Sequence, residues 1–358
     1  MSGRQLLVGL VGAGRQGRVL ARALREVASV QLAAVVDPRI ESAWRIATEW
    51  KLSGSAVHLS VSECGSSGVH AWIIATPPSS HLTNLTELLR LRTPPKAVLC
   101  EKPAAWSLHD VARMAQLAEH AGVHLQFGLH LLAAIPPPVL SWLDGGGLGD
   151  LVEVSGEWLR ADGDPDWGHF RDVDCPGSAF DLGPHLLGVI LPVLGQRSPV
   201  RAVTTKMTSS PTTPPLGAGP LHRDSSTEME LYQLRPGGYD LAGRVSIAWS
   251  GGSGTGLTIR LGGTEGVFTM RLDERGGDAV VRVRLDGRSA RAAGVAGTWE
   301  TPVRDCYRRQ LKNLVTVADT GAADCVPPGA RVDAAVASTR LITAAYRSAN
   351  QGGELVSW

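Results

Sequence analysis

Short apolar runs alternate with amphipathic stretches over about the first third of the chain. The runs cover 6–11, 32–36, 72–75, 97–100 and 123–127, and almost every residue in them is apolar. Strands that are covered by helices on both faces have this composition. Between the runs, apolar residues recur at helical spacing over 16–27, and Ser107 with Asp110 three residues later is typical of a capped helix start for 108–120. This rhythm predicts a parallel, doubly wound α/β sheet.

The pattern changes after Gly128. Three prolines at 136–138 and three glycines at 145–147 are expected to break the chain, and helical stretches are expected around 178–194, 303–320 and 331–350. The predicted strands are 151–159, 201–207, 228–234, 244–249, 257–261, 267–272 and 279–285. Such a series predicts an α+β domain with one open, mostly antiparallel sheet. We therefore expect two domains, 1–130 and 131–358, with the C-terminal helix able to pack back on the first.

Charge and cysteine content exclude several classes of function. The chain has 358 residues, and its 35 Lys and Arg against 34 Asp and Glu leave a net charge of +1 without a basic tract, which argues against nucleic acid as a partner. Its five cysteines are widely spaced and include no C-x-x-C pair, so we expect reduced thiols in a cytoplasmic protein and no metal site. Because no apolar run reaches about 18 residues, no membrane span is expected.

A glycine-rich turn carries the first sign of chemistry. It follows the apolar run 6–11 directly and opens the next helical stretch, with the sequence Gly12-Ala13-Gly14-Arg15-Gln16-Gly17. In such a turn Gly12 permits a tight bend, Gly14 lets the backbone approach a pyrophosphate, and Gly17 lets helix and strand pack closely. The N-terminus of the helix adds free N–H groups and a positive dipole end. Together these features predict a dinucleotide site.

Asp37 ends the second apolar run, twenty residues after Gly17. A carboxylate at this point can accept hydrogen bonds from the adenosine ribose hydroxyls, which favours NAD over NADP. Arg15 and Arg39 leave NADP open, because a guanidinium in either place could meet a 2′-phosphate. After the run 72–75, Ala75, Thr76, Pro77 and His81 are expected to line the cofactor crevice, although His81 could instead lie in the first turn of a helix.

Lys102 follows the apolar run 97–100 in the segment Cys100-Glu101-Lys102-Pro103. In an open α/β sheet, ligands bind at the carboxyl ends of strands. An ammonium group there would stabilise the negative charge that develops on oxygen during hydride transfer, and it could relay a proton. The alternative is that Glu101 and Lys102 form a structural ion pair.

Asp181 and His185 stand four residues apart in the apolar stretch 178–194. In a helix this spacing places both side chains on one face, and histidine exchanges protons readily near neutral pH. Pro184 predicts that the helix kinks or begins there. Without further information, an Asp and His pair of this kind is structural more often than catalytic.

Taken together, these motifs resemble the family of glucose-fructose oxidoreductase, inositol dehydrogenase and rhizopine catabolism proteins (Gfo/Idh/MocA). The resemblance covers essentially the whole chain and includes 147–154 and Ala345-Tyr346-Arg347-Ser348. It implies a Rossmann domain followed by an open-sheet domain whose broad face packs against a second subunit, giving a dimer or tetramer. It also implies that Lys102, Asp181 and His185 are the catalytic residues. The expected cofactor-binding residues are Gly12, Gly14, Arg15, Gln16, Gly17, Asp37, Arg39, Ala75, Thr76, Pro77, His81, Glu101 and Lys102.

Two positions depart from the family pattern. Gly188 stands where many members carry Asp, and the segment 129–132, which ends in Leu132, replaces a polar pair that often contacts polyols. These changes suggest a substrate with fewer hydroxyl groups than an inositol or a plain sugar. The residues expected to wall the substrate pocket are His130, Trp158, Arg160, Trp167 and Arg171, although both tryptophans could equally be packing residues.

We therefore predict an NAD(P)-dependent oxidoreductase. The expected reaction is hydride transfer between the nicotinamide and a secondary alcohol, ketone or imine carbon of a small cyclic metabolite such as a sugar, nucleotide sugar or cyclitol. His185 would act as general acid/base, Asp181 would orient it or bind substrate, and Lys102 would stabilise the oxyanion. Two alternatives share this fold: a glycosidase that oxidises its sugar transiently, and a sensor that binds dinucleotide without catalysis.

Overall fold

The computed structural model describes most of the chain and divides it into two compact units. The described residues are 5–65, 68–161, 163–166, 168–171, 175–195, 199–209, 223–250, 256–273 and 279–358, without the side chains of residues 169 and 171. Unit 1 comprises residues 1–133 and 304–332, and unit 2 comprises 134–303 and 333–358. Trp167 and the side chain of Arg171, both predicted to wall the substrate pocket, lie outside the described residues.

Unit 1 contains a six-stranded parallel sheet, as the apolar runs predict. The strands are β1 (Leu6–Val11), β2 (Val30–Val36), β3 (Val57–His58), β4 (Ala71–Ile74), β5 (Ala97–Cys100) and β6 (His124–Phe127). Their order is β3-β2-β1-β4-β5-β6, so the direction of winding reverses between β1 and β4. In sheets of this type the ligand crevice lies at that reversal, outside the carboxyl ends of the strands. The pattern missed β3, because two residues at a sheet edge are too short to produce one.

The helices of unit 1 are α1 (Arg15–Leu24), α2 (Ile40–Trp50), α3 (His81–Leu89), α4 (Leu108–His120) and α8 (Val303–Thr320). The predicted cap of α4 is present, since the Asp110 backbone N–H donates to the Ser107 hydroxyl at 3.1 Å. A cap of this kind satisfies one of the free N–H groups in the first turn of a helix. Short 3-10 turns complete the unit, at Gly54–Ala56, Val61–Cys64, Pro78–Ser80, His130–Ala134 and Pro328–Ala330.

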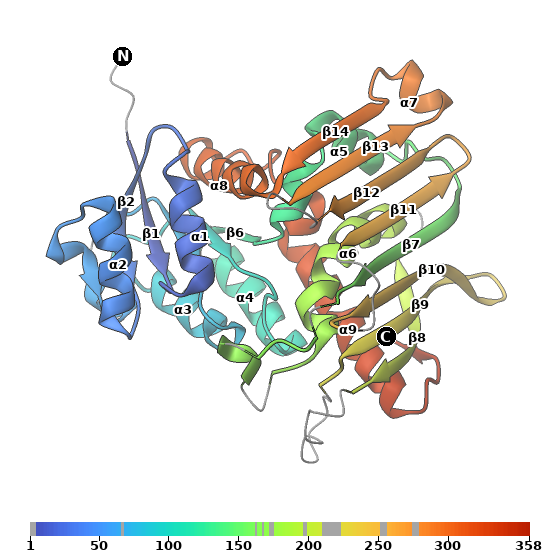
Figure 1. Ribbon diagram of the computed structural model, residues 1–358, viewed down its shortest axis with the longest axis horizontal. Coiled ribbons are helices and arrows are strands. Elements are labelled where there is room, and N and C mark those ends of the chain that lie inside the picture. The colour runs from blue at the N-terminus through green and yellow to red at the C-terminus, as the bar shows by residue number, and fades with distance from the viewer. Residues whose placement is uncertain are drawn as a thin grey trace. The chain divides into compact units, whose positions relative to one another are not determined.

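Helix α8 belongs to unit 1 although it follows almost all of unit 2 in the sequence (Figure 1, where the orange-red α8 joins blue and cyan elements). Its apolar side chains are buried in the same core as Leu20 and Leu99, and they include Leu311, Leu314, Val315 and Ala318. Burial of this apolar stripe stabilises the helix in place. The predicted division at residue 130 therefore needs correction: 304–332 returns to the first unit, and the last helix lies in the second.

Unit 2 is built on a nine-stranded sheet. Its strands are β7 (Leu151–Leu159), β8 (Val200–Thr208), β9 (Ser226–Arg235), β10 (Gly238–Ala248), β11 (Leu257–Gly263), β12 (Val267–Asp273), β13 (Val280–Asp286), β14 (Gly297–Pro302) and β15 (Val356–Ser357). The order is β14-β13-β12-β11-β7-β10-β9-β8-β15, and the neighbouring pair β7 and β10 is parallel while the others are antiparallel. The open, mostly antiparallel sheet is thus confirmed. The two edge strands β14 and β15 were missed, because edge strands carry little apolar alternation.

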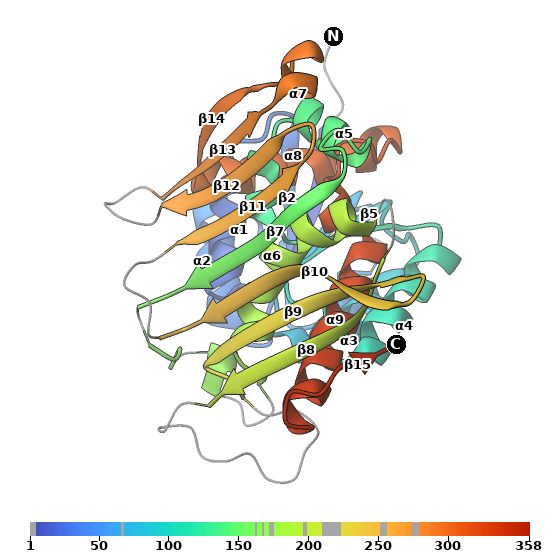
Figure 2. The same cartoon turned by 90° about the vertical axis from the view of Figure 1, so that its right-hand side faces the viewer.

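Helices cover one face of this sheet and leave the other open (Figure 2, with α6 and α9 behind the strands). They are α5 (Pro137–Asp144), α6 (Ser178–Gly195), α7 (Arg288–Ala292) and α9 (Val332–Asn350), and a 3-10 turn spans Gly168–Arg171. Helix α6 packs closely on the strands, since a Cβ atom on Gly156 would lie 2.8 Å from the Ile190 side chain. The prolines at 136–138 were expected to break the chain, but they start α5, because proline is tolerated in the first turn of a helix.

Of the two alternatives expected at Pro184, a helix that begins there was wrong. Helix α6 neither begins nor stops there but runs continuously from Ser178 to Gly195. The lost backbone hydrogen bond is offset by burial, since the helix packs against five strands of its sheet. Of the part of the chain that is described, α6 has the length and apolar composition to cross a membrane, but 78% of it is buried inside the structure, as in a core helix.

Candidate functional site

The glycine turn between β1 and α1 has the geometry that the sequence predicts. Gly12 has a φ of +94°, and a Cβ atom there would lie 2.6 Å from the carbonyl oxygen of Ala75. A Cβ atom on Gly17 would lie 1.9 Å from the Gly12 carbonyl oxygen, so strand and helix are in contact. Gly14 differs, because none of the described atoms lies within 4 Å of its Cβ position. Of the three glycines in this turn, only Gly14 therefore has open space at its Cβ position.

The N-terminus of α1 is suited to an anion. Gly14 is its N-cap residue, and within the described structure no side chain caps this end and no acidic residue lies in the first turn. The first N–H groups of a helix need acceptors, and the positive end of the helix dipole attracts a phosphate. The open space at Gly14 and the uncapped N-terminus together fit the pyrophosphate of a dinucleotide.

Asp37 directly follows β2 beside this turn and is only 4% exposed. Its Oδ2 accepts a hydrogen bond from the Ala13 backbone N–H at 2.8 Å, and its Oδ1 accepts one from the Arg39 backbone N–H at 2.8 Å. The Arg39 side chain is 73% exposed, with Nε 3.7 Å from the same carboxylate. Asp37 thus braces the glycine turn. Arg15 is exposed at the start of α1.

The segment after β4 needs one correction. Ala75 and Thr76 are half-buried beside the glycine turn, Pro77 is exposed, and the Asn84 side chain donates to the Thr76 hydroxyl at 2.9 Å. His81 was predicted to contact cofactor, but its ring is fully buried at the start of α3. Its nitrogens lie 2.9 Å from the Thr76 carbonyl oxygen and 3.0 Å from that of Ala104. The buried His81 ring therefore connects the segment after β4, at Thr76, to the segment after β5, at Ala104.

A buried hydrogen bond connects the glycine turn to the residue before Lys102. The Gln16 side chain donates from Nε2 to Glu101 Oε1 at 3.0 Å, and the Lys102 backbone N–H donates to Oε2 at 3.2 Å. The carboxyl group also lies against Gly128, where a Cβ atom would be 2.7 Å away. Lys102 itself is half-buried directly after β5. This arrangement places Lys102 at the edge of the sheet where the dinucleotide site lies.

The environment of Glu101 favours its neutral form. Burial raises the pKa of its carboxyl group from 4.5 to about 7, although hydrogen bonding by Gln16 and the charge of Lys102 act in the opposite direction. Burial thus outweighs the charge of Lys102 in setting the pKa of this carboxyl group.

His130 and Tyr307 lie in contact within unit 1. Their rings are stacked, with centroids 3.9 Å apart and planes 15° apart. Burial, and secondly the charge of Lys102, lowers the pKa of His130 to about 3, so its ring is neutral at physiological pH. Burial also raises the pKa of Tyr307, whose hydroxyl group hydrogen-bonds Gln16. Sequence reasoning missed Tyr307, because it arrives on α8 from a distant part of the chain.

In unit 2, Asp181 and His185 lie one turn apart on α6. His185 is 2% exposed, and its ring centroid is 5.6 Å from that of Trp158, which lies on β7 and is 6% exposed. The Trp249 indole N–H donates to Asp181 Oδ2 at 2.9 Å. Two tryptophans therefore contact the two predicted catalytic residues of this unit. Trp249, at the end of an apolar strand, carries no local signal of this role.

Further contacts hold Trp249 in place. Phe170 meets its ring edge-on at a centroid distance of 5.7 Å, and the guanidinium of Arg223 lies 5.6 Å from the same ring. Arg223 also donates to the Phe170 carbonyl oxygen at 2.6 Å. Arg160, predicted to contact substrate, is half-buried and donates its backbone N–H to Ala248 at 2.8 Å. Among the residues described, no group of three or more His, Cys, Asp or Glu side chains could hold a metal ion.

Comparison with known proteins decides the family. A family model described as an oxidoreductase family with an NAD-binding Rossmann fold matches residues 6–129. The rhizopine catabolism protein MocA of Rhizobium meliloti is 30% identical over 274 residues, which cover 74% of this chain and 78% of MocA. The chain belongs to the Gfo/Idh/MocA family.

Other Gfo/Idh/MocA relatives agree with this assignment. Inositol 2-dehydrogenase 4 of Saccharopolyspora erythraea is 37% identical over 129 residues, which cover 35% of this chain and 36% of that enzyme. The crystal structure of GenD2 from gentamicin A biosynthesis, in complex with NAD, superposes with a TM-score of 0.76 at 25% identity and covers 100% of this chain and 97% of GenD2. The chain is thus an NAD-binding oxidoreductase, as the sequence predicts.

Two glycine variants test the placement of the dinucleotide. Gly14→Ala fits the open space at that position, so we expect it to fold like the wild type but to bind NAD at least about tenfold more weakly, because the methyl group occupies the phosphate's place. Gly17→Ala forces the turn itself to move, so it should lower both thermal stability and affinity. Isothermal titration calorimetry and thermal unfolding measure both effects. Wild-type affinity in Gly14→Ala would show that the pyrophosphate binds elsewhere.

The pKa of Glu101 predicts a pH-dependent stability. The folded chain keeps this proton up to about pH 7, whereas the unfolded chain releases it near 4.5, so the group's contribution to the free energy of unfolding falls as pH rises between these values. At about 1.4 kcal/mol per unit of pKa, the loss amounts to roughly 3 kcal/mol. Denaturant unfolding of Glu101→Gln over this range should lack that decline, with exposed Glu41→Gln as the control. An identical decline in wild type and Glu101→Gln would contradict the buried protonation.

Proposed function

We propose that this protein catalyses reversible hydride transfer between a nicotinamide cofactor and a secondary alcohol, ketone or imine carbon of a small cyclic metabolite, such as a sugar, nucleotide sugar or cyclitol. The hydrogen bond between Gln16 and Glu101 carries the proposal, because it ties Lys102 to the glycine turn that fits a dinucleotide. The relatives named for inositol oxidation and rhizopine catabolism support the substrate class. The site residues Lys102, Asp181 and His185 each have a chemical role in this reaction.

When bound, the nicotinamide ring supplies the acceptor or donor of hydride. In the oxidation direction, His185 accepts the proton of the substrate hydroxyl group while the carbon that bears this hydroxyl loses hydride. In the reduction direction, His185 donates the proton back to the substrate oxygen. Lys102 stabilises the partial negative charge on the reacting oxygen with its ammonium group. Asp181, held by the Trp249 indole, orients His185 or accepts a hydrogen bond from substrate.

NAD is the proposed cofactor in preference to NADP. The support is Asp37, whose buried carboxylate ends β2 where the ribose hydroxyls of a dinucleotide bind, and where a 2′-phosphate would meet a like charge. The exposed Arg39 pairs with this same carboxylate. Its charge is therefore partly engaged and less suited to a phosphate.

The substrate is proposed to carry fewer hydroxyl groups than an inositol. Leu129, Leu131 and Leu132 are all buried, and Gly188 lies inside the buried part of α6. At these positions the chain offers packing atoms in place of hydrogen-bonding side chains. A cytoplasmic location is also proposed, because none of the five cysteines forms a disulfide.

Replacing Lys102 tests the reaction. A panel of sugars, nucleotide sugars, cyclitols and cyclic imines is first screened with NAD and NADP by nicotinamide absorbance. With the best substrate, Lys102→Met should lower kcat about a hundredfold to a thousandfold, since one oxyanion-stabilising group contributes about 3–4 kcal/mol, while NAD affinity stays the same. Lys96→Met is the matched control, because Lys96 is exposed just before the opposite end of β5.

Three results would overturn this assignment. Near-normal turnover in Lys102→Met would remove Lys102 from the chemistry. Hydrolysis of a glycoside without net change in nicotinamide absorbance would identify a transient-redox glycosidase instead. Tight NAD binding without turnover of any panel member would point to a sensor.

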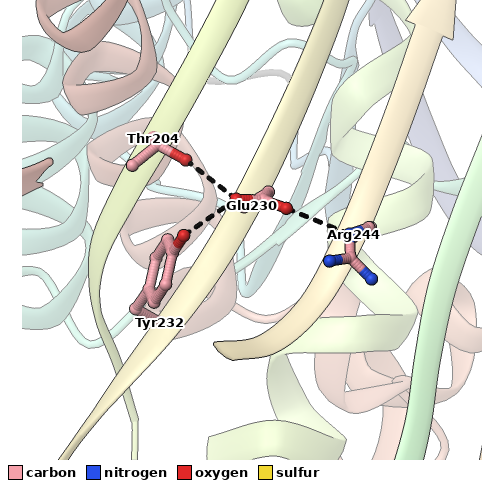
Figure 3. Close-up of polar contacts among 4 residues, drawn as sticks. All are labelled: Thr204, Glu230, Tyr232 and Arg244. Carbon is pink, nitrogen blue, oxygen red and sulfur yellow. Dashed lines mark hydrogen bonds and ion pairs between the residues drawn. The ribbon is translucent and has the colours of Figure 1, made fainter. Parts of the chain in front are cut away.

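We also propose that the open face of the unit 2 sheet binds a second copy of this chain. The tip of the β9–β10 hairpin exposes Leu234, Tyr239 and Leu241 at 54%, 37% and 44%, and Tyr239 and Leu241 lie opposite Leu234 and Tyr232 in the register. Beside them, Glu230 bonds Thr204, Tyr232 and Arg244 (Figure 3). An exposed apolar patch is a typical interaction surface.

The charges of this face favour a copy of the same chain as the partner. Several of its acidic and basic side chains pair with one another across strands, including Arg260 with Glu153 and Arg282 with Glu300 at 2.7 Å. A partner of strongly opposite charge therefore gains little here. In a two-fold arrangement the same apolar patch meets itself, which is the commonest way in which homodimers form.

Leu241→Asp should weaken this association, because a charge would have to be buried in the apolar contact. Analytical ultracentrifugation is expected to show a dimer or tetramer for the wild type and a shift toward monomer for the variant. Leu355→Asp is the matched control, since Leu355 is also 44% exposed and directly precedes β15, which β8 separates from the hairpin. A wild-type chain that is monomeric at micromolar concentration would refute the proposal.

A further inference from the structure

A buried carboxylate lies at the start of the helix that carries Asp181 and His185. Asp224 is 1% exposed, and its Oδ2 accepts hydrogen bonds from the Ser178 hydroxyl at 2.5 Å, the Thr227 hydroxyl at 2.6 Å and the Ala179 backbone N–H at 3.1 Å. The Asp224 carbonyl oxygen accepts from the Ser178 backbone N–H at 2.9 Å. One residue outside α6 therefore binds its first two N–H groups.

Tyr346 completes this arrangement from α9. Its hydroxyl donates to Asp224 Oδ1 and accepts from the Gly177 backbone N–H at 3.0 Å, and its ring lies 5.8 Å from that of Phe180. The backbone of Gly177 also lies directly against Asp224, since a Cβ atom on Gly177 would lie 1.9 Å from the Asp224 carbonyl oxygen. Free N–H groups at a buried helix start need acceptors, and here Asp224 and Tyr346 provide them for three consecutive residues.

The same chain segment also reaches Asp181 from the other side. Ser225, next to Asp224, accepts the Trp249 backbone N–H at 2.9 Å, and the Trp249 indole donates to Asp181 at 2.9 Å. The direction of α6 and the orientation of the Asp181 carboxylate are thus both set by residues 224–225. A buried charge fixes the direction of the groups that bond it, while its net effect on stability is small compared with apolar packing.

We propose that Asp224 and Tyr346 are positioning residues, which hold the first turn of α6 so that Asp181 and His185 present their side chains in the orientation that the reaction requires. This inference rests on the proposed function of those two residues. It also gives a role to Tyr346. This residue belongs to the segment 345–348, which is part of the family resemblance but has no role in the dinucleotide site.

Ser348 provides a matched control on the same helix. It is fully buried, its hydroxyl accepts from the Thr205 backbone N–H at 2.9 Å and donates to the Glu354 carbonyl oxygen at 2.6 Å, and it does not bond α6. Tyr346→Phe and Ser348→Ala each remove one buried hydroxyl group, so the groups that bonded it lose a hydrogen-bond partner. Each is expected to lower thermal stability by a similar amount.

The kinetic test compares these two variants. Tyr346→Phe should lower kcat at least about tenfold and shift the pH profile of kcat/KM, while NAD affinity stays at the wild-type value. Ser348→Ala should keep the wild-type kcat and pH profile. Asp224→Asn, which replaces an acceptor with a donor, should reproduce the effect of Tyr346→Phe. Equal effects of Tyr346→Phe and Ser348→Ala, or wild-type kinetics in Tyr346→Phe, would overturn the proposal.

A spectroscopic readout separates this inference from the proposed reaction. The ¹H–¹⁵N signal of the Trp249 indole, assigned with Trp249→Phe, reports its hydrogen bond to Asp181 without any substrate. Tyr346→Phe should move this signal and Ser348→Ala should leave it in place. If the wild type turns over no substrate but the signal moves as expected, the reaction is wrong and the positioning stands. If the signal does not move in Tyr346→Phe, the positioning fails whatever the enzyme catalyses.

Discussion

The hydrogen bond from Gln16 to Glu101 is the contact on which unit 1 depends for its chemistry. It joins the turn after β1 to the end of β5, two segments separated by 85 positions in the sequence. Glu101 can accept it only because Gly128 leaves room for the carboxyl group. Tyr307 then meets Gln16 from α8. A ligand-binding edge made of separate loops needs such cross-connections, because the loops themselves have few packing contacts.

Unit 2 uses the same principle with a different residue. There the rigid element is α6, and a buried aspartate receives its first N–H groups where a solvent-exposed helix would use water. The two units differ in whether a side chain bonds the N–H groups at the start of the helix. Within the described residues no side chain caps the start of α1, whereas Asp224 accepts the first two N–H groups of α6. A helix N-terminus that binds a ligand and one that only orients side chains can thus be told apart by their partners.

Local spacing allowed much of this fold to be predicted from the sequence. Apolar runs located most strands to within a residue or two, and the glycine turn was recognisable because its residues are adjacent in the chain. Contacts between distant segments were not predictable: Trp249 with Asp181, Tyr346 with Asp224 and Tyr307 with His130 join positions that no short pattern relates. Likewise the apolar stripe of α8 predicts a buried helix but does not indicate in which unit the helix is buried. For His81 the sequence left a cofactor contact and the first turn of a helix both open, because a histidine that bonds two backbone carbonyls looks, in sequence, like one that faces a ligand.

The return of residues 304–332 to unit 1 has a consequence for how the chain is made. A ribosome delivers β1 to β6 first, then almost all of unit 2, and only afterwards the helix that covers the remaining apolar surface of the first sheet. Unit 1 therefore stays incomplete while unit 2 is being synthesised, although its six strands are already present. Domains generally fold as they emerge, N-terminal first. Here unit 1, which contains the Rossmann sheet, is synthesised first but completed late. Its apolar face therefore stays exposed to solvent in the nascent chain until α8 has been synthesised.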